Sequence, residues 1–82
     1  MEDIVEKNRI VQEWLGEHHF FNIKNSSDNC FIRADGYKNR MVIAIRGDYE
    51  INEKEILEFA ARNHRQAWIA NINDEEIEWE TL

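Results

Sequence analysis

Residues 30–46 read CFIRADGYKNRMVIAIR, and apolar side chains alternate with other side chains on both sides of Lys38-Asn39. This alternation predicts a β-hairpin, because successive side chains of a strand point to opposite faces of a sheet. One face, which we expect to pack on the core, carries Cys30, Ile32, Ala34, Met41, Ile43 and Ile45. The other face carries Phe31, Arg33, Asp35, Tyr37, Arg40, Val42, Ala44 and Arg46. We expect this second face to be the functional surface, because it holds the charged side chains.

The segments before the hairpin predict a helix and a strand. Residues 3–17 have the apolar spacing of an amphipathic helix, with Val11 and Leu15 on its apolar side. Phe20 to Lys24 is short and rich in aromatic residues, which is typical of a strand. The three strands up to Arg46 therefore form an antiparallel meander.

The segments after the hairpin predict a second helix and two more strands. Asn52, with Glu55 three residues later, is typical of a helix N-cap, and this helix should end near His64. Residues 66–72 are apolar on both faces, as in an interior strand that could run parallel to one of the first three. Ile77, Trp79 and Thr81 alternate with Glu76, Glu78 and Glu80. This pattern is typical of an edge strand whose charges prevent pairing with another strand. The order helix, three-stranded meander, helix, strand, edge strand predicts an α+β domain over residues 1–82.

Composition narrows the classes of protein to consider. A chain of 82 residues is long enough for one hydrophobic core and too short for two. Cys30 is the single cysteine, which excludes an internal disulfide and fits a reducing compartment. The N-terminus is acidic and no apolar run approaches the length of a membrane span, so we expect a cytoplasmic protein that does not contact a membrane. The net charge of −7 argues against a general nucleic-acid coat protein.

Side chains with catalytic or metal-binding chemistry are few and scattered. His18, His19 and His64 fall at the predicted ends of helices, where we interpret them as terminal residues rather than metal ligands. We interpret Cys30 as a small core residue rather than a reactive thiol. The acidic run Glu76, Glu78 and Glu80 has strand spacing too wide for one shared cation. We therefore expect no cofactor and no metal ligand.

The order of elements and three segments resemble the PD-(D/E)XK, or restriction endonuclease-like, superfamily. The stretch from Ile32 to Asp35 is similar to the segment that bears the first catalytic acid of these nucleases. The stretch from Val42 to Arg46 is similar to the strand that bears their second acid and lysine. Residues 13–15 followed by residues 20–23 resemble the first helix and strand of the small resolvase-like members. The similarity spans residues 3–73.

Three positions depart from the pattern of that superfamily. Its paired carboxylates hold Mg²⁺, and its lysine helps to position or deprotonate water. Ala44 stands at the second acid and binds no cation, whereas Arg46 replaces the lysine and stays protonated. Asn8 stands at the helix glutamate of the resolvase-like members. The resemblance therefore implies a nuclease-like fold that has lost metal-dependent cleavage.

Three functional hypotheses follow from these residues. The first is a non-catalytic domain that binds a protein or nucleic acid through Phe31, Arg33, Tyr37, Arg40 and Arg46. In the simplest alternative, Arg33 and Arg46 only form ion pairs with Asp35 and with acids of the helices.

The other two hypotheses differ in whether nucleic acid is involved at all. The second is a Mg²⁺-dependent nuclease in which Glu6, Asp28 or Asp48 supplies the missing acid. The third is a protein-only adaptor or regulator, which the net charge favours, and whose edge strand could pair with a second copy of the chain.

Overall fold

The computed structural model of the chain describes residues 4–47 and 50–82. Within them the elements follow the order α1 (Ile4–Glu17), β1 (Phe21–Asn25), β2 (Phe31–Asp35), β3 (Arg40–Ile45), α2 (Glu53–Arg62), β4 (Gln66–Asn73) and β5 (Glu76–Thr81). This confirms the predicted α+β class and the order of its elements. Over the described residues, both helices are too short and too polar to traverse a lipid bilayer.

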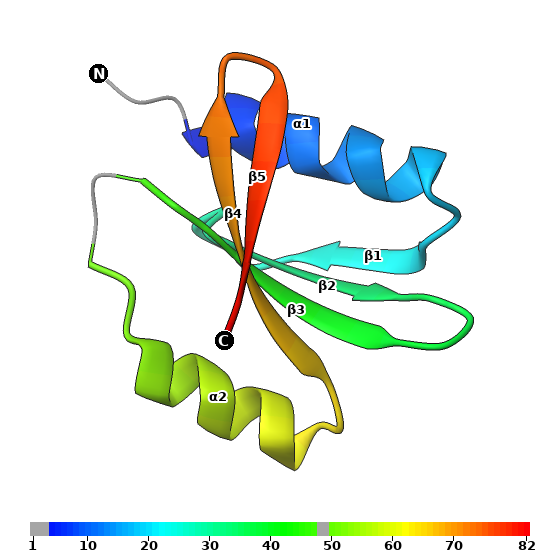
Figure 1. Cartoon of the computed structure of the whole chain (residues 1–82), viewed down its shortest axis with the longest axis vertical. Helices are drawn as coiled ribbons and strands as arrows, with labels where there is room; N and C mark the ends of the chain where they lie inside the picture. The colour runs from blue at the N-terminus through cyan, green and yellow to red at the C-terminus, as the bar shows by residue number, and fades with distance from the viewer. Residues whose placement is uncertain (1–3, 48–49) are drawn as a thin grey trace.

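The five strands form one twisted sheet in the order β1-β2-β3-β4-β5 (Figure 1). Neighbouring strands are antiparallel except β3 and β4, which are parallel. A parallel pair needs a crossover connection, and the segment that contains α2 supplies it. The interior position predicted for residues 66–72 is therefore confirmed, and so is the edge position of the glutamate-rich strand β5.

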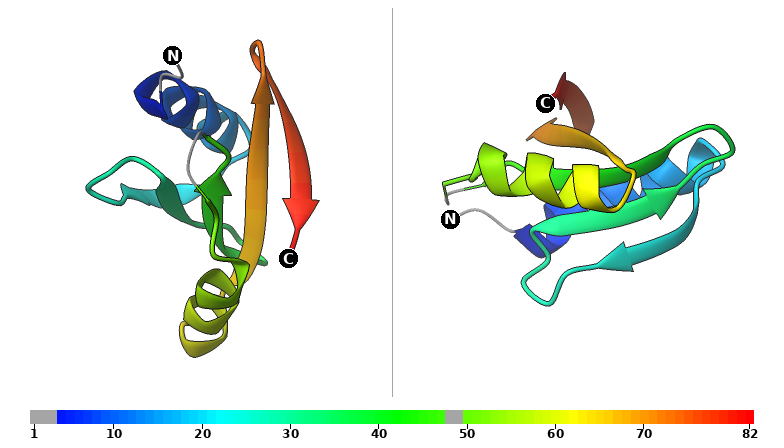
Figure 2. Two further views of the ribbon diagram at one scale, coloured as in Figure 1. Left: turned by 90° about the vertical axis from the view of Figure 1, so that its left-hand side faces the viewer. Right: turned by 90° about the horizontal axis from the view of Figure 1, so that it is seen from below.

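The two helices cover opposite faces of the sheet (Figure 2). Helix α1 contributes Val11 and Leu15 to a first core, where they pack on Ile32, Ala34, Met41, Ile43, Ile45 and Ala70. The inner face predicted for the hairpin is confirmed at these β2 and β3 positions. Helix α2 contributes Ile56 and Ala60 to a second core, where they pack on Val42, Ala44, Ala67 and Ile69.

The second core corrects the prediction of a polar functional face on the hairpin. Val42 and Ala44 lie on that face, yet Val42 is 4% exposed and Ala44 is fully buried. The cause is α2, which contacts β3 and β4 and removes this half of the face from solvent. The part of the face that belongs to β2 is not covered in the same way, since Arg33 remains exposed.

Both helices end in the same hydrogen-bonded motif, and each places a histidine at the residue with left-handed backbone. His19 has a φ of 65° and His64 a φ of 54°. The next residue then donates its backbone N–H to the carbonyl five positions back, from Phe20 to Leu15 (3.0 Å) and from Arg65 to Ala60 (2.8 Å). This is a Schellman motif, in which glycine is the usual residue at that position. The interpretation of these histidines as helix-terminal residues is confirmed.

Glycine at these two positions should stabilise the fold. A side chain with a Cβ is strained in the left-handed region, so His19→Gly and His64→Gly should each raise the free energy of unfolding by about 0.5–1 kcal/mol, or Tm by about 2–8 °C. Glu17→Gly, within the last turn of α1, is the matched control and should lower Tm. Thermal unfolding followed by circular dichroism measures all three, and a lower Tm for both histidine variants would contradict the assignment.

Candidate functional site

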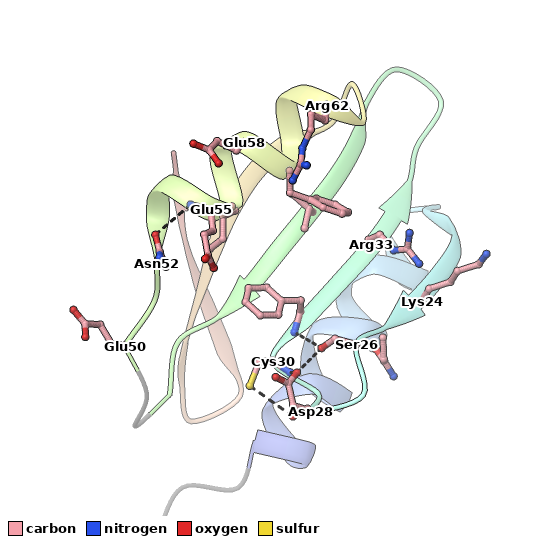
Figure 3. A pocket seen from close by; sticks show the side chains of 15 residues that line it. Lys24, Ser26, Asp28, Cys30, Arg33, Glu50, Asn52, Glu55, Glu58 and Arg62 are labelled. Carbon is pink, nitrogen blue, oxygen red and sulfur yellow. Dashed lines mark hydrogen bonds between the residues drawn. The ribbon is translucent and has the colours of Figure 1, made fainter.

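An open groove of about 820 Å³ lies between α2 and the part of the β1–β2 hairpin that α2 does not cover (Figure 3). Its walls are α2 and the segment before it on one side, and β1, β2 and their connecting loop on the other. The groove exists because α2 packs on β3 and β4, which leaves the same face of β1 and β2 without a covering helix.

The floor of the groove is apolar and aromatic. Val42 of β3 and Ile56 of α2 are buried beneath it. Phe31 of β2 and Phe59 of α2 are half-buried and line the groove from opposite walls. Both phenylalanines also pack against the second core, which holds their rings in place.

Three cations gather at one end of the groove. Lys24 of β1 lies directly opposite Arg33 of β2 in the antiparallel register, and Arg62 comes from the last turn of α2. Figure 3 shows Lys24 and Arg33 on the strand wall and Arg62 on the helix wall above them. Among the residues that the structure describes, none of the three has a hydrogen-bond or ion-pair partner for its side chain.

A β-bulge brings Lys24 to this face. The register of β1 shifts between Phe21, which pairs with Asp35, and Lys24, which pairs with Arg33. The strand therefore carries one extra residue there, and Asn22 within it has a φ of 53°. In a regular strand, Phe21 and Lys24 would point to opposite faces, so the bulge turns Lys24 into the groove.

The other end of the groove is acidic. Glu50 and Glu55 lie there near the start of α2, which Asn52 caps by accepting a hydrogen bond from the Glu55 N–H at 3.2 Å. Figure 3 shows these side chains across the groove from the β1–β2 loop. With the cations at the opposite end, the groove is electrostatically bipolar.

Asp28 holds the β1–β2 loop in shape at this acidic end. Its Oδ1 accepts hydrogen bonds from the Ser26 hydroxyl (2.6 Å) and the Cys30 N–H (3.0 Å). These bonds, the one from Ser26 first, lower the pKa of the Asp28 carboxyl. Cys30 is half-buried on the groove wall rather than in the core, which corrects its predicted position, because it precedes β2 and belongs to the loop.

Asp35 is the centre of a structural ion-pair network outside the groove. Its Oδ1 lies 3.1 Å from Nη1 of Arg65 and 3.5 Å from Nε of Arg40, and its Oδ2 accepts a hydrogen bond from Asn22. Arg65 is nearly buried and also donates to the Met41 carbonyl at 3.1 Å. Burial alone would raise the pKa of Asp35, but the Asn22 hydrogen bond and the Arg65 charge lower it below its ordinary value.

The degenerate nuclease positions Asp35, Ala44, Arg46 and Asn8 do not converge on one site. Asp35 pairs with Arg40 at one end of the β2–β3 hairpin, whereas Ala44 pairs with Phe31 four residues along β3, about 13 Å away. Ala44 faces α2, while Asn8 belongs to α1 on the opposite face of the sheet. Asp35, Ala44 and Arg46 do lie on one face of the sheet, as the alternation predicts, but hairpin register separates Asp35 from Ala44 along that face and Asn8 lies on the other face, so the four positions form no common site.

Asn8 has a structural role in place of the predicted one. It is 2% exposed, and its amide donates a hydrogen bond to the Asn29 carbonyl at 3.0 Å. Its Oδ1 accepts from Gln12, which also reaches Asn25. Asn8 and Gln12 thus fasten α1 to the β1–β2 loop.

The five predicted binding residues separate into two groups. Phe31 and Arg33 line the groove. Arg40 pairs with Asp35. Arg46 pairs with Glu80 and donates a hydrogen bond from its Nε to the Oδ1 of Asn71 at 3.0 Å. Tyr37 lies in the β2–β3 turn, 89% exposed, with its ring against Phe21. A binding role for these side chains remains a prediction.

Three groove residues were missed by sequence reasoning. Lys24 follows a bulge that no local signal announces, although its charge and its closeness to a strand end were visible. Phe59 and Arg62 are three residues apart on α2, and the sequence of the helix does not show which strands they would face.

The acids considered as replacements for the missing nuclease acid have other partners or positions. Glu6 forms an ion pair with Arg9 on the solvent side of α1, and Asp28 holds the β1–β2 loop. Asp48 lies outside the described residues. In residues 4–47 and 50–82, no three His, Cys, Asp or Glu side chains are grouped closely enough to hold a metal ion.

Removing the charge of Asp35 should destabilise the fold in a pH-dependent way. Because the folded-state pKa is lowered, the ionised carboxylate stabilises the fold above its ordinary pKa of 3.8 and loses this effect as the pH falls through the folded value. Asp35→Asn should therefore cost about 1–3 kcal/mol near pH 7 and less near pH 3. Urea unfolding at both pH values measures this.

The matched control is Glu58→Gln, an exposed carboxylate of α2 with no ion pair among the described residues. It should change the free energy of unfolding by less than about 0.5 kcal/mol at either pH. An equal loss of stability for Asp35→Asn at both pH values would contradict the ion-pair assignment.

The chain was compared with known proteins by its sequence. No protein-family model matches it, and no curated protein matches it either.

Proposed function

We propose that this domain is a binding module that holds a segment of a macromolecular partner in the groove beside α2 and carries out no hydrolysis of its own. The observation that carries the proposal is the groove itself, whose aromatic floor is partly open to solvent between two charged ends. Sites that bind ligands commonly combine an apolar concave surface with a few placed polar groups. Phe31 and Phe59 supply the apolar contact, and the cations supply the polar one.

The positions of the acids argue against hydrolysis. Metal-assisted cleavage of a phosphodiester needs carboxylates free to hold the cation. Asp35 is instead surrounded by Arg40, Arg65 and Asn22, and a methyl group occupies the position of the second acid at Ala44. These contacts support the loss of cleavage that the nuclease resemblance implies.

Groove charge favours a protein partner over a nucleic acid. Asp28, Glu50, Glu55 and Glu58 line the groove together with Lys24, Arg33 and Arg62, so acids outnumber bases within it. The whole chain carries a net charge of −7. A nucleic acid brings a phosphate at each nucleotide and gains affinity from unbroken positive surface. A polypeptide can instead place an acidic side chain at the basic end of the groove and a basic one at the acidic end.

The edge strand β5 is a weaker candidate for an interface. Glu76, Glu78 and Glu80 are exposed along it. Two copies paired through this edge would bring rows of carboxylates close together, which is unfavourable.

Peptide binding should map to the groove. A random dodecapeptide library displayed on phage is selected on the full chain, and the enriched peptides are synthesised and titrated into ¹⁵N-labelled protein. We expect amide chemical-shift changes at Ser26, Phe31, Arg33 and Phe59, because these residues line both walls. Changes confined to β5, or to α1 and the sheet face beneath it, would place the site elsewhere and overturn the proposal.

The chain should not cleave nucleic acid. Incubation of single-stranded and duplex DNA and of RNA with the protein and Mg²⁺ or Mn²⁺ should leave them intact, because Ala44 rather than an acid stands at the second motif position. Gel electrophoresis measures the products, with Asp35→Asn as the matched variant. Cleavage by the wild type that Asp35→Asn abolishes would restore the nuclease hypothesis.

A further inference from the structure

The arginines of this chain divide sharply into paired and unpaired side chains. Arg9, Arg40, Arg46 and Arg65 each form an ion pair with a carboxylate. The remaining two, Arg33 and Arg62, form none with the residues that the structure describes, and both line the groove. The same is true of Lys24, the third cation there. Every described arginine without an ion pair therefore lies in the groove, although the chain is rich in acids.

The placement of Lys24 opposite Arg33 is unfavourable for the isolated fold. Like charges that face each other directly across an antiparallel pair destabilise it. The bulge in β1 is what creates this pair, since a regular strand would turn Lys24 to the other face. An anion bound between Lys24, Arg33 and Arg62 would remove the repulsion, so the cluster is complementary to a negative group from a partner.

The acidic end of the groove sets a second condition on the occupant. Glu50 and Glu55 have no ion-pair partner among the described residues, unlike Asp28, which is held by the loop. The half-buried rings of Phe31 and Phe59 line the same groove. An occupant that is negative along its whole length would meet repulsion at Glu50 and Glu55, whereas one with a single negative end would not.

We propose that the groove binds an extended polypeptide segment of a partner protein that places an aspartate or glutamate between Lys24, Arg33 and Arg62 and a large apolar side chain on Phe31 and Phe59. This inference rests on the proposed function and names the partner chemistry for the same groove. The segment runs with its acidic residue toward the C-terminal end of α2. A basic or uncharged residue follows at the Glu50 and Glu55 end.

The test is a set of parallel phage selections of the random dodecapeptide library on three forms of the full chain. Lys24→Glu/Arg33→Glu reverses two cations of the groove. Lys38→Glu/Lys54→Glu lowers the net charge by the same amount at two exposed lysines that do not line it. All substituted side chains are exposed, and folding of each form is checked by circular dichroism.

The wild type and the control should enrich peptides in which an acidic residue neighbours a large apolar one. The groove variant should lose this preference and favour basic residues instead. A synthetic peptide from the wild-type selection should bind the groove variant at least about tenfold more weakly and the control about equally, because two ion pairs are replaced by repulsion.

Other results would overturn the inference in distinguishable ways. Peptides that bind the groove with no acidic preference, or with the same preference in the groove variant, would refute the acidic anchor and leave groove binding intact. An oligothymidylate strand that binds at physiological salt and displaces the selected peptides would make the partner a nucleic acid. If the wild type selects no peptide and binds no oligonucleotide, the proposed function fails as well.

Discussion

Strand β3 is buried on both faces, and the arrangement of the other elements depends on this. Met41, Ile43 and Ile45 pack toward α1, while Val42 and Ala44 pack toward α2. A strand with no solvent-exposed face needs a covering layer on each side and a neighbour along each edge. The antiparallel hairpin with β2 supplies one neighbour, and the parallel crossover through α2 supplies the other, β4.

The groove is a consequence of how little of the sheet α2 can cover. A helix of ten residues packs on β3 and β4 and leaves β1 and β2 bare on the same face. The apolar side chains at the boundary, Phe31 and Phe59, are half-buried for this reason. The short helix therefore both completes the second core and creates the concave surface beside it.

Charged side chains fulfil two different roles in this domain. Asp35 joins β2 to Arg65, the residue before β4, and to Arg40 of β3, so its carboxylate connects this end of the β2–β3 hairpin to the end of the crossover. Arg46 and Glu80 similarly tie β3 to the edge strand β5. Lys24, Arg33 and Arg62 take part in no such contact among the described residues, although several carboxylates lie on the same wall of α2.

Local patterns of the sequence were sufficient for the α+β class, the element order, the inner face of the hairpin and the cap at Asn52, because alternation and capping are properties of neighbouring residues. They also indicated Phe31 and Arg33 as surface residues of interest. The burial of Ala44, its separation from Asp35 and Asn8, and the turning of Lys24 into the groove were decided by the tertiary structure alone. Each depends on which face a distant helix covers, on hairpin register or on a bulge, and these are set by packing between segments far apart in the chain.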